Sequence, residues 1–144
     1  MPKQGRIKRQ RLPSQNFLSF SISPIKITIR RYKIKTVKDK YLVVGADFAG
    51  FPLKEAVVAH LEAKGWKITD LGVTKDSDPN DTENMFHRVG LRVGAEISEG
   101  NFERALLFCG TGMGIHIAAS KCPHVHAGVV ESVPAALRAI QVTA

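Results

Sequence analysis

Short apolar runs alternate with amphipathic stretches along the chain from residue 41 onward. Apolar or alternating runs bounded by glycine and polar residues predict strands at 41–44, 66–71, 105–108 and 125–130. Apolar residues at helical spacing predict helices at 51–64, 85–99, 112–121 and from 133 to 140. Strands and helices that alternate at this spacing predict right-handed βαβ units on a parallel sheet, which defines an α/β fold class.

The first helix is predicted to be amphipathic. Its apolar side chains share one face, which we expect to pack against the sheet: Leu53, Ala56, Val57 and Leu61. Its charged residues, Lys54 among them, fall largely outside that face. Pro52 suits a first helical turn, and Gly65 suits the position just past a helix end.

Two segments follow predicted strands, where parallel sheets bind their ligands. They are 45–50, Gly-Ala-Asp-Phe-Ala-Gly, and 109–114, Cys-Gly-Thr-Gly-Met-Gly. Glycines at 110, 112 and 114 allow a tight turn that brings successive backbone N–H groups close to an anion. The anion is either a phosphate or an oxyanion formed during a reaction. A purely structural tight turn is the third interpretation.

Cys109 and Thr111 add chemistry to the second of these segments. A thiol just before a helix N-terminus is favoured as thiolate, and a thiolate can act as a general base. The Thr111 hydroxyl can orient or shuttle a proton. The alternative for Cys109 is a small buried apolar residue at a strand end, and that interpretation is preferred for Cys122.

The sequence predicts neither a cofactor nor a metal. The spacing of the glycines is not the dinucleotide fingerprint, and no P-loop lysine follows them. Cys109, Cys122 and three histidines lie within one stretch, but the paired spacing of a structural zinc site is absent. The acids of the polar segment 72–84 lack the glycine and terminal Glu of a calcium loop, and this segment is interpreted as solvated.

Charge divides the 144-residue chain in two. The whole sequence has 21 Lys and Arg against 13 Asp and Glu, a net charge of +8. Residues 1–40 hold 12 of the basic residues and one acid, for a net of +11, whereas residues 41–144 have a net of −3. We therefore treat 1–40 as a basic N-terminal extension, disordered or targeting, and 41–144 as the domain. A functionless extension and a mitochondrial transit segment are both open. A nucleic-acid-binding arm is least favoured, because no aromatic interleaving supports it.

Two cysteines make no disulfide framework, and no run of about 18 apolar residues exists that would span a membrane. We therefore expect a cytoplasmic protein without membrane association, or a mitochondrial one if residues 1–40 act as a transit segment.

The motifs in segments 45–50 and 109–115, with Leu53-Lys54 and Ala118-Ala119-Ser120-Lys121, resemble the ribose-5-phosphate isomerase B and galactose-6-phosphate isomerase family. The resemblance covers about 41 to 140. It implies a Rossmann-like three-layer α/β/α domain with a mostly parallel sheet, working as a homodimer or tetramer. The implied activity is the metal-independent interconversion of a small phosphorylated aldose and ketose, of the ribose 5-phosphate and ribulose 5-phosphate type.

The resemblance also assigns roles. Cys109 would be the general base that moves a proton between C1 and C2 through a cis-enediolate, and Thr111 would assist with the oxygen-bound proton. Backbone N–H groups across Gly110, Gly112, Met113 and Gly114 would hold the enediolate, and Asp47 would bind sugar hydroxyls. A base beside preformed donors is what such an intermediate requires.

The sequence departs from the family pattern at several positions. Phe48 stands where the family has a phosphate-binding His, and Ser120 stands where it has Asn. The family's His-Asn pair falls about where Gln141-Val142 stand, and the arginines beyond it have no counterpart before the end at Ala144. The domain is therefore expected to be C-terminally incomplete. The alternative function is a catalytically impaired family member that acts at most as a binding subunit.

Overall fold

The computed structural model describes residues 35–143 of the chain. Interpretations of the basic extension therefore fall outside the described residues, except for 35–40. The elements, in chain order, are β1 (Tyr41–Ala46), α1 (Phe51–Ala63), β2 (Lys67–Asp70), the 3₁₀ turn η1 (Thr82–Asn84), α2 (Phe86–Ser98), β3 (Ala105–Phe108), α3 (Met113–Ala119) and α4 (Val133–Thr143).

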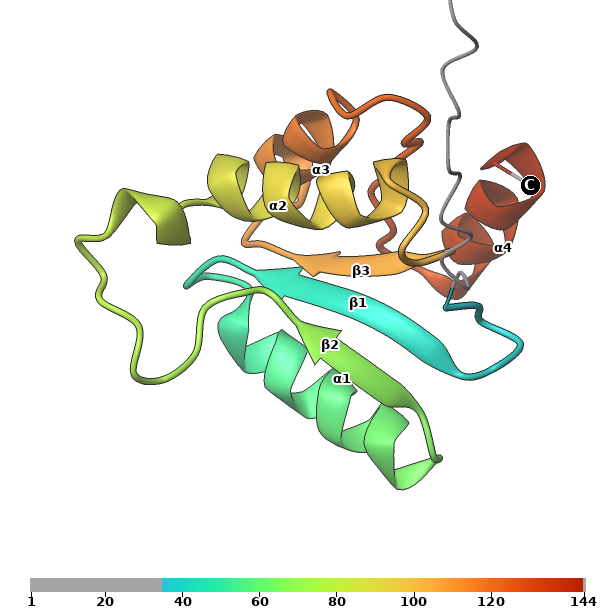
Figure 1. Ribbon diagram of the computed structural model, residues 1–144, viewed down its shortest axis with the longest axis horizontal. Coiled ribbons are helices and arrows are strands. Elements are labelled where there is room, and N and C mark those ends of the chain that lie inside the picture. The colour runs from blue at the N-terminus through green and yellow to red at the C-terminus, as the bar shows by residue number, and fades with distance from the viewer. Residues whose placement is uncertain (1–34, 144) are drawn as a thin grey trace, which may run out of the picture. The chain divides into compact units, whose positions relative to one another are not determined.

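The strands form a parallel sheet in the order β2-β1-β3. Leu42 of β1 lies opposite Ile68 of β2, and Val43 lies opposite Ala105 of β3. The central strand β1 is buried from its second residue onward, because helices cover both faces of the sheet. Figure 1 shows α1 on one face, with α2 and α3 on the other. The predicted three-layer α/β/α arrangement is confirmed.

The core lies between the sheet and the α2 and α3 layer. Val43 packs there with Val89 and Val93 of α2, Phe102 and Ile115, each at most 3% exposed. Burial of one such side chain contributes roughly 1.5–3 kcal/mol before chain entropy is counted. Gly45 lets α2 approach β1 closely, because a methyl group there would lie 2.7 Å from a Val93 methyl carbon.

The predicted burial of α1 is wrong at several positions. Lys54 is fully buried and is the buried residue of this helix. Leu53, which was expected inside, is 60% exposed, and Ala56 of the same predicted face is exposed as well. The Lys54 ammonium group has acceptors on β2 and on the chain just after it, at Asp70 and Val73. These acceptors make it possible to bury the charge.

The predicted strand at 125–130 is also wrong, since this segment has no regular secondary structure and pairs with no strand of the described sheet. Within residues 35–143 the sheet has three strands. The odd positions from Val125 to Val129 are half-buried and the even ones are exposed. Val129 contacts Gly112, and the Ala127 N–H donates to the Ser120 hydroxyl at 3.3 Å. The alternating pattern therefore reflects one-sided burial rather than pairing in the sheet.

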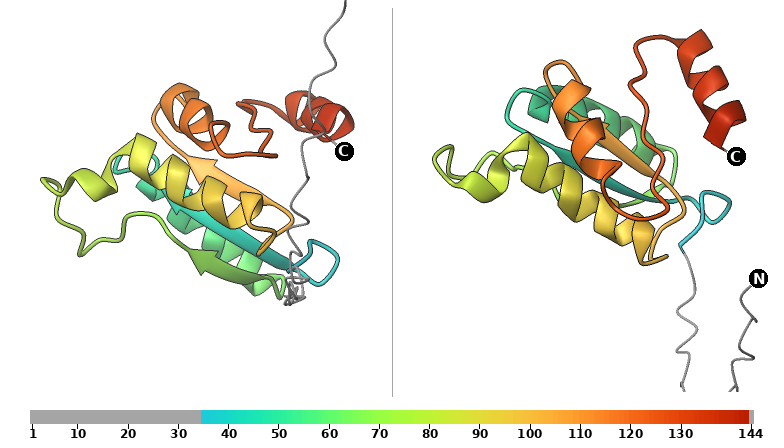
Figure 2. Two further views of the ribbon diagram at one scale, coloured as in Figure 1. Left: turned by 45° about the horizontal axis from the view of Figure 1, so that its top comes forward. Right: turned by 90° about the horizontal axis from the view of Figure 1, so that it is seen from above.

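Two further features complete the described part of the chain. The backbone of Lys35 forms a parallel bridge with Phe102, so contacts with the domain begin before residue 41. The last helix, α4, packs against none of the other described helices or strands, and its Val133 and Leu137 are 74% and 60% exposed. Figure 2 shows α4 standing apart from the layers. None of the described helices has the length and apolar character needed to cross a membrane.

Candidate active site

The two glycine-containing loops meet at the carboxyl end of the sheet. Ala46, the last residue of β1, lies opposite Phe108, the last residue of β3, so the chains that follow leave the sheet side by side. The Asp47 N–H donates to the Phe108 carbonyl at 3.3 Å. A methyl group on Gly50 would lie 2.1 Å from the carbonyl carbon of Phe108 and 2.4 Å from the nitrogen of Cys109. The loops are therefore in direct contact.

The first loop is organised by Asp47. Its side chain is 9% exposed, and its Oδ1 accepts a hydrogen bond from the Gly50 N–H at 2.8 Å. This contact closes the turn that starts α1. Within residues 35–143, the Oδ2 atom accepts no hydrogen bond from the protein and stays available to a ligand. Phe48, at the tip of the turn, is 40% exposed and presents an apolar ring.

The second loop turns at Gly112, whose φ of +72° favours glycine. Thr111 is exposed, and its hydroxyl accepts the Met113 N–H at 3.3 Å, which ties the loop to the start of α3. Packing explains why position 114 is glycine, because a methyl group there would lie 2.5 Å from the Phe86 ring. The geometry of this loop is thus set both by a hydrogen bond within the loop and by packing against α2.

The amides of this loop are open to a ligand. Among residues 35–143, the N–H groups of Gly110, Thr111 and Gly112 donate to no protein acceptor. Consecutive N–H groups of this kind form a concavity that suits an anion. Both the phosphate and the oxyanion interpretations made from the sequence are compatible with this geometry.

Cys109 lies at the junction of the two loops and is half-buried. Its side chain packs against the edge of the core cluster formed by Val43 and its neighbours. One side of Cys109 is therefore apolar, as in a small core residue, while the residue as a whole remains partly exposed. Cys122 is also half-buried, but its Sγ lies 3.6 Å from the Leu91 carbonyl oxygen on α2, outside the two loops.

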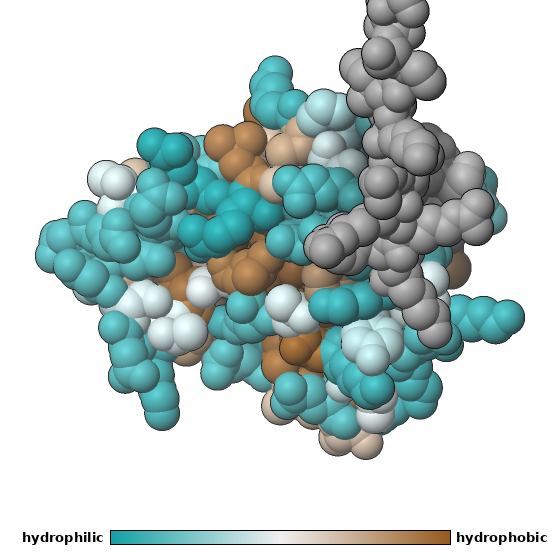
Figure 3. Space-filling model, in the orientation of Figure 1, coloured by the Kyte–Doolittle hydropathy of each residue, from teal (hydrophilic) through white to brown (hydrophobic). Residues whose placement is uncertain are grey.

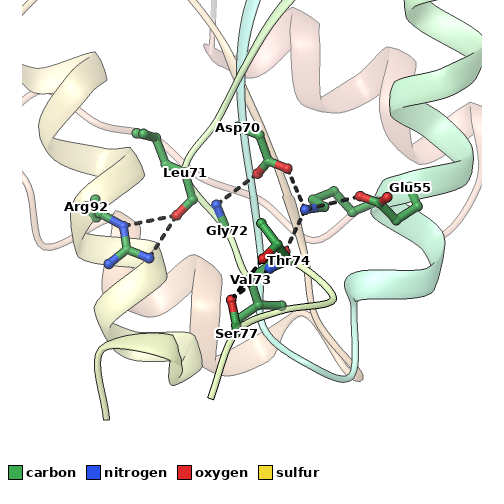
Figure 4. Close-up of polar contacts among 9 residues, drawn as sticks. Glu55, Asp70, Leu71, Gly72, Val73, Thr74, Ser77 and Arg92 are labelled. Atoms are coloured by element: carbon green, nitrogen blue, oxygen red, sulfur yellow. Dashed lines mark hydrogen bonds and ion pairs between the residues drawn. The ribbon is translucent and has the colours of Figure 1, made fainter. Parts of the chain in front are cut away.

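A polar cluster beside the first loop was missed by the sequence analysis. The Lys54 Nζ contacts Asp70 Oδ2 at 2.5 Å, the Val73 carbonyl at 2.7 Å and Glu55 Oε1 at 3.3 Å. From the other side of the sheet, Arg92 of α2 donates to the Leu71 carbonyl through Nε at 3.0 Å and Nη2 at 2.8 Å. Figure 4 shows these contacts converging on the segment after β2. Helical periodicity carries no signal for a buried lysine.

Charge effects are clearest at the opposite end of the strands. The Lys67 ammonium donates to the Tyr41 hydroxyl at 3.0 Å. This hydrogen bond lowers the pKa of the Tyr41 phenol and raises the pKa of Lys67. Within the described residues, no group of three or more His, Cys, Asp and Glu side chains is placed to hold a metal ion.

The fold defines a Rossmann-like α/β protein, in which the loops after β1 and β3 lie together at the carboxyl end of the sheet. The sequence model of the ribose/galactose isomerase family matches residues 42–143. The chain belongs to this family, and the resemblance stated from the sequence is confirmed.

Its relatives include sugar isomerases of several specificities. The chain is 42% identical over 95 residues to the 4-deoxy-4-sulfo-D-erythrose isomerase of a Clostridium species. This alignment covers 66% of this chain and 57% of that protein. It is 40% identical over 91 residues to ribose-5-phosphate isomerase B of Escherichia coli, covering 62% and 57%. The chain thus spans less than two thirds of the length of these relatives.

Solved structures of the same family match this chain as well. Ribose-5-phosphate isomerase B of Clostridium thermocellum matches with a TM-score of 0.59 and 29% identity over 67% of this chain and 62% of that one. A ribose 5-phosphate isomerase of Thermotoga maritima matches with a TM-score of 0.59 and 28% identity over 67% and 63%. Both comparisons support the Rossmann-like fold.

Proposed function

We propose that this chain is an aldose–ketose isomerase of a small phosphorylated sugar, of the ribose 5-phosphate and ribulose 5-phosphate type. The observation that carries the proposal is the half-buried Cys109 next to the amides of Gly110, Thr111 and Gly112, which have no acceptor within residues 35–143. A base and a set of anion donors within one turn are the two components that enolisation of a carbonyl compound needs.

The reaction begins when the Cys109 thiolate takes the proton from the carbon next to the sugar carbonyl. The electron pair of that C–H bond forms the C=C bond of a cis-enediolate, and the carbonyl oxygen becomes the oxyanion. The loop amides hold this oxygen where its charge develops. Return of the proton to the neighbouring carbon, with collapse of the other oxygen to a carbonyl, gives the isomeric sugar and restores the thiolate.

The other site residues orient the sugar and its oxygen-bound proton. Thr111 moves the hydroxyl proton between the oxygens on C1 and C2 of the enediolate. Asp47 accepts a hydrogen bond from a sugar hydroxyl through Oδ2. The Met113 N–H, which donates to Thr111 in the structure, becomes available when that hydroxyl turns to the substrate. Together with the Gly114 N–H, it extends the amide cradle into α3.

The substrate class is a short sugar with an anionic end group. Relatives of this chain are named as isomerases of 4-deoxy-4-sulfo-D-erythrose, D-erythrulose 4-phosphate and ribose 5-phosphate. These substrates share a carbonyl-bearing end and an anionic group at the other end. The exposed Phe48 ring at the rim of the site provides apolar contact in place of a positively charged group.

The active species is proposed to be a homodimer or tetramer. Met113 and Ile117 lie one helical turn apart on α3 and are 57% and 52% exposed, so α3 presents an apolar face next to the site. Figure 3 shows apolar surface left uncovered between hydrophilic residues on the viewed face of the molecule. Apolar surface of this kind is typical of subunit contacts.

The test is an isomerisation assay of the full chain, with D-ribose 5-phosphate, D-erythrose 4-phosphate and 4-deoxy-4-sulfo-D-erythrose as substrates and ketose formation followed by NMR. We expect turnover of at least one of these sugars without added metal. If none is converted by protein whose circular dichroism shows the α/β fold, the proposed function is wrong and the alternative of a non-catalytic binding subunit gains support.

A further inference from the structure

Lys54 stands out because its charge is buried and touches neither of the loops that carry the proposed chemistry. It is 0% exposed, and its ammonium group has three acceptors, on Asp70, Val73 and Glu55. A well-packed apolar residue in place of a buried ion pair is often no less stable. Stability alone is therefore a weak explanation for a charge at this position.

The contacts of Lys54 close a ring around the Asp47 turn. Its backbone N–H donates to the Gly50 carbonyl at 3.0 Å, and the Gly50 N–H donates to Asp47 Oδ1 at 2.8 Å. Its side chain donates to the Val73 carbonyl at 2.7 Å, and the Val73 N–H donates to the carbonyl of Ala46, the residue before Asp47, at 2.9 Å. The turn is thus held at both of its ends.

This ring bears directly on the second loop. Gly50, one of its members, packs against the Phe108–Cys109 peptide more closely than any side chain would allow. The segment that contains Val73 is also held from the opposite face of the sheet, where Arg92 donates two hydrogen bonds to the Leu71 carbonyl. Figure 4 shows Arg92 and Asp70 reaching this segment from its two sides. A shift of Val73 would therefore move the Asp47 turn relative to Cys109.

We propose that Lys54 is a positioning residue for this site, which sets the place of the Asp47 turn relative to Cys109 through its hydrogen bond to the Val73 carbonyl. The inference rests on the proposed isomerase function. The ion pair with Asp70 neutralises the buried charge, and the bond to Val73 fixes the geometry. The two contributions can be separated by mutation.

The experiment compares Asp70→Asn with the double variant Lys54→Met/Asp70→Asn in the full chain. Both variants lack the ion pair with Asp70, and the amide oxygen that replaces the Asp70 carboxylate remains an acceptor for the Gly72 N–H. They differ in the hydrogen bond to the Val73 carbonyl and in the contact of Lys54 with the exposed Glu55 carboxylate. At a temperature at which both are folded, we expect kcat of the double variant to be about 10- to 100-fold below that of Asp70→Asn, because small misplacements of a base are costly. Lys64→Met, an exposed lysine at the end of the same helix, serves as the control and should keep the wild-type kcat.

A second readout is independent of turnover. The rate of Cys109 alkylation by iodoacetamide, followed by mass spectrometry, should differ at least about threefold between the two variants if the loop moves. If the wild-type chain isomerises none of the sugars tested, the proposed function fails, and this alkylation rate alone decides the positioning role.

Equal kcat and equal alkylation rates in the two folded variants would overturn the proposal and leave Lys54 with a purely structural role. Should the double variant fail to fold, Lys54→Gln replaces it, because its amide is one bond shorter and cannot hold Val73 in place. A lower kcat in folded Lys54→Gln supports the positioning role, and a wild-type kcat contradicts it.

Discussion

Gly50 is where the two loops of the site touch most closely, and its replacement by alanine is the sharpest mechanical perturbation that the structure offers. The backbone of Gly50, with φ −86° and ψ −13°, is one that any residue can adopt. Only the space for a side chain is missing. Gly50→Ala therefore tests the contact between the loops without adding backbone strain.

The size of the effect follows from the distances. The new methyl group would lie 2.1 Å from the carbonyl carbon of Phe108, whereas ordinary contact begins at 3.4 Å, a difference of 1.3 Å. The obstructing atoms belong to the backbone and cannot rotate away, so the loops must separate. Overpacking of this kind costs about 1–3 kcal/mol of unfolding free energy. A displacement of about 1 Å at a reacting centre lowers the rate by about 100-fold.

The assay measures thermal unfolding by circular dichroism and kcat/KM for the sugar that the wild-type chain converts. We expect a Tm drop of at least about 4 °C and a loss of about 100-fold in kcat/KM at a temperature at which the variant is folded. The matched control is Gly128→Ala, because a methyl group at Gly128 meets nothing within 4 Å. Wild-type Tm and activity in Gly50→Ala would refute the close contact between the loops.

Three further substitutions test the site and its surroundings. Thr111→Val removes the acceptor of the Met113 N–H, and we expect a loss of about 0.5–1.5 kcal/mol of unfolding free energy in denaturant together with lower turnover; unchanged stability would argue against this hydrogen bond. Gly112→Ala places a side chain at a φ of +72° and should cost about 1–3 kcal/mol by the same measurement, and a neutral effect would contradict the left-handed turn. Lys67→Met should raise the pKa of the Tyr41 phenol, seen by NMR of the ring, because the ammonium that stabilises the phenolate is gone; a lower pKa would contradict the pairing.

The fold and the place of the site could be predicted from local pattern. The runs at 41–44 and 105–108 are short and apolar, with a glycine within two residues after each run, and each is part of a strand in the structure. The loops that contain Asp47 and Cys109 were each predicted to follow a strand, at the end of the sheet where ligands bind. The structure places these two loops in contact. Local pattern is sufficient here because each loop follows its strand directly.

Two features could not be predicted because they depend on contacts far apart in the sequence. Lys54 is buried since its acceptors, Asp70 and Val73, lie sixteen and nineteen residues further along the chain. The 125–130 segment alternates like a strand because one of its sides rests on the domain at Gly112. Periodicity detects burial on one side of an extended chain, but it does not show whether a backbone partner is present.

The identity of the base is most directly tested by the incorporation of solvent deuterium. The full chain is incubated in D₂O with the sugar it converts, and proton NMR follows deuterium at C1 and C2 of the aldose and ketose. We expect exchange in the wild type and in Cys122→Ala, whose thiol is equally half-buried but lies outside the loops. Cys109→Ala should exchange at least about 100-fold more slowly while keeping its fold. Exchange at the wild-type rate in Cys109→Ala would show that another group removes the proton.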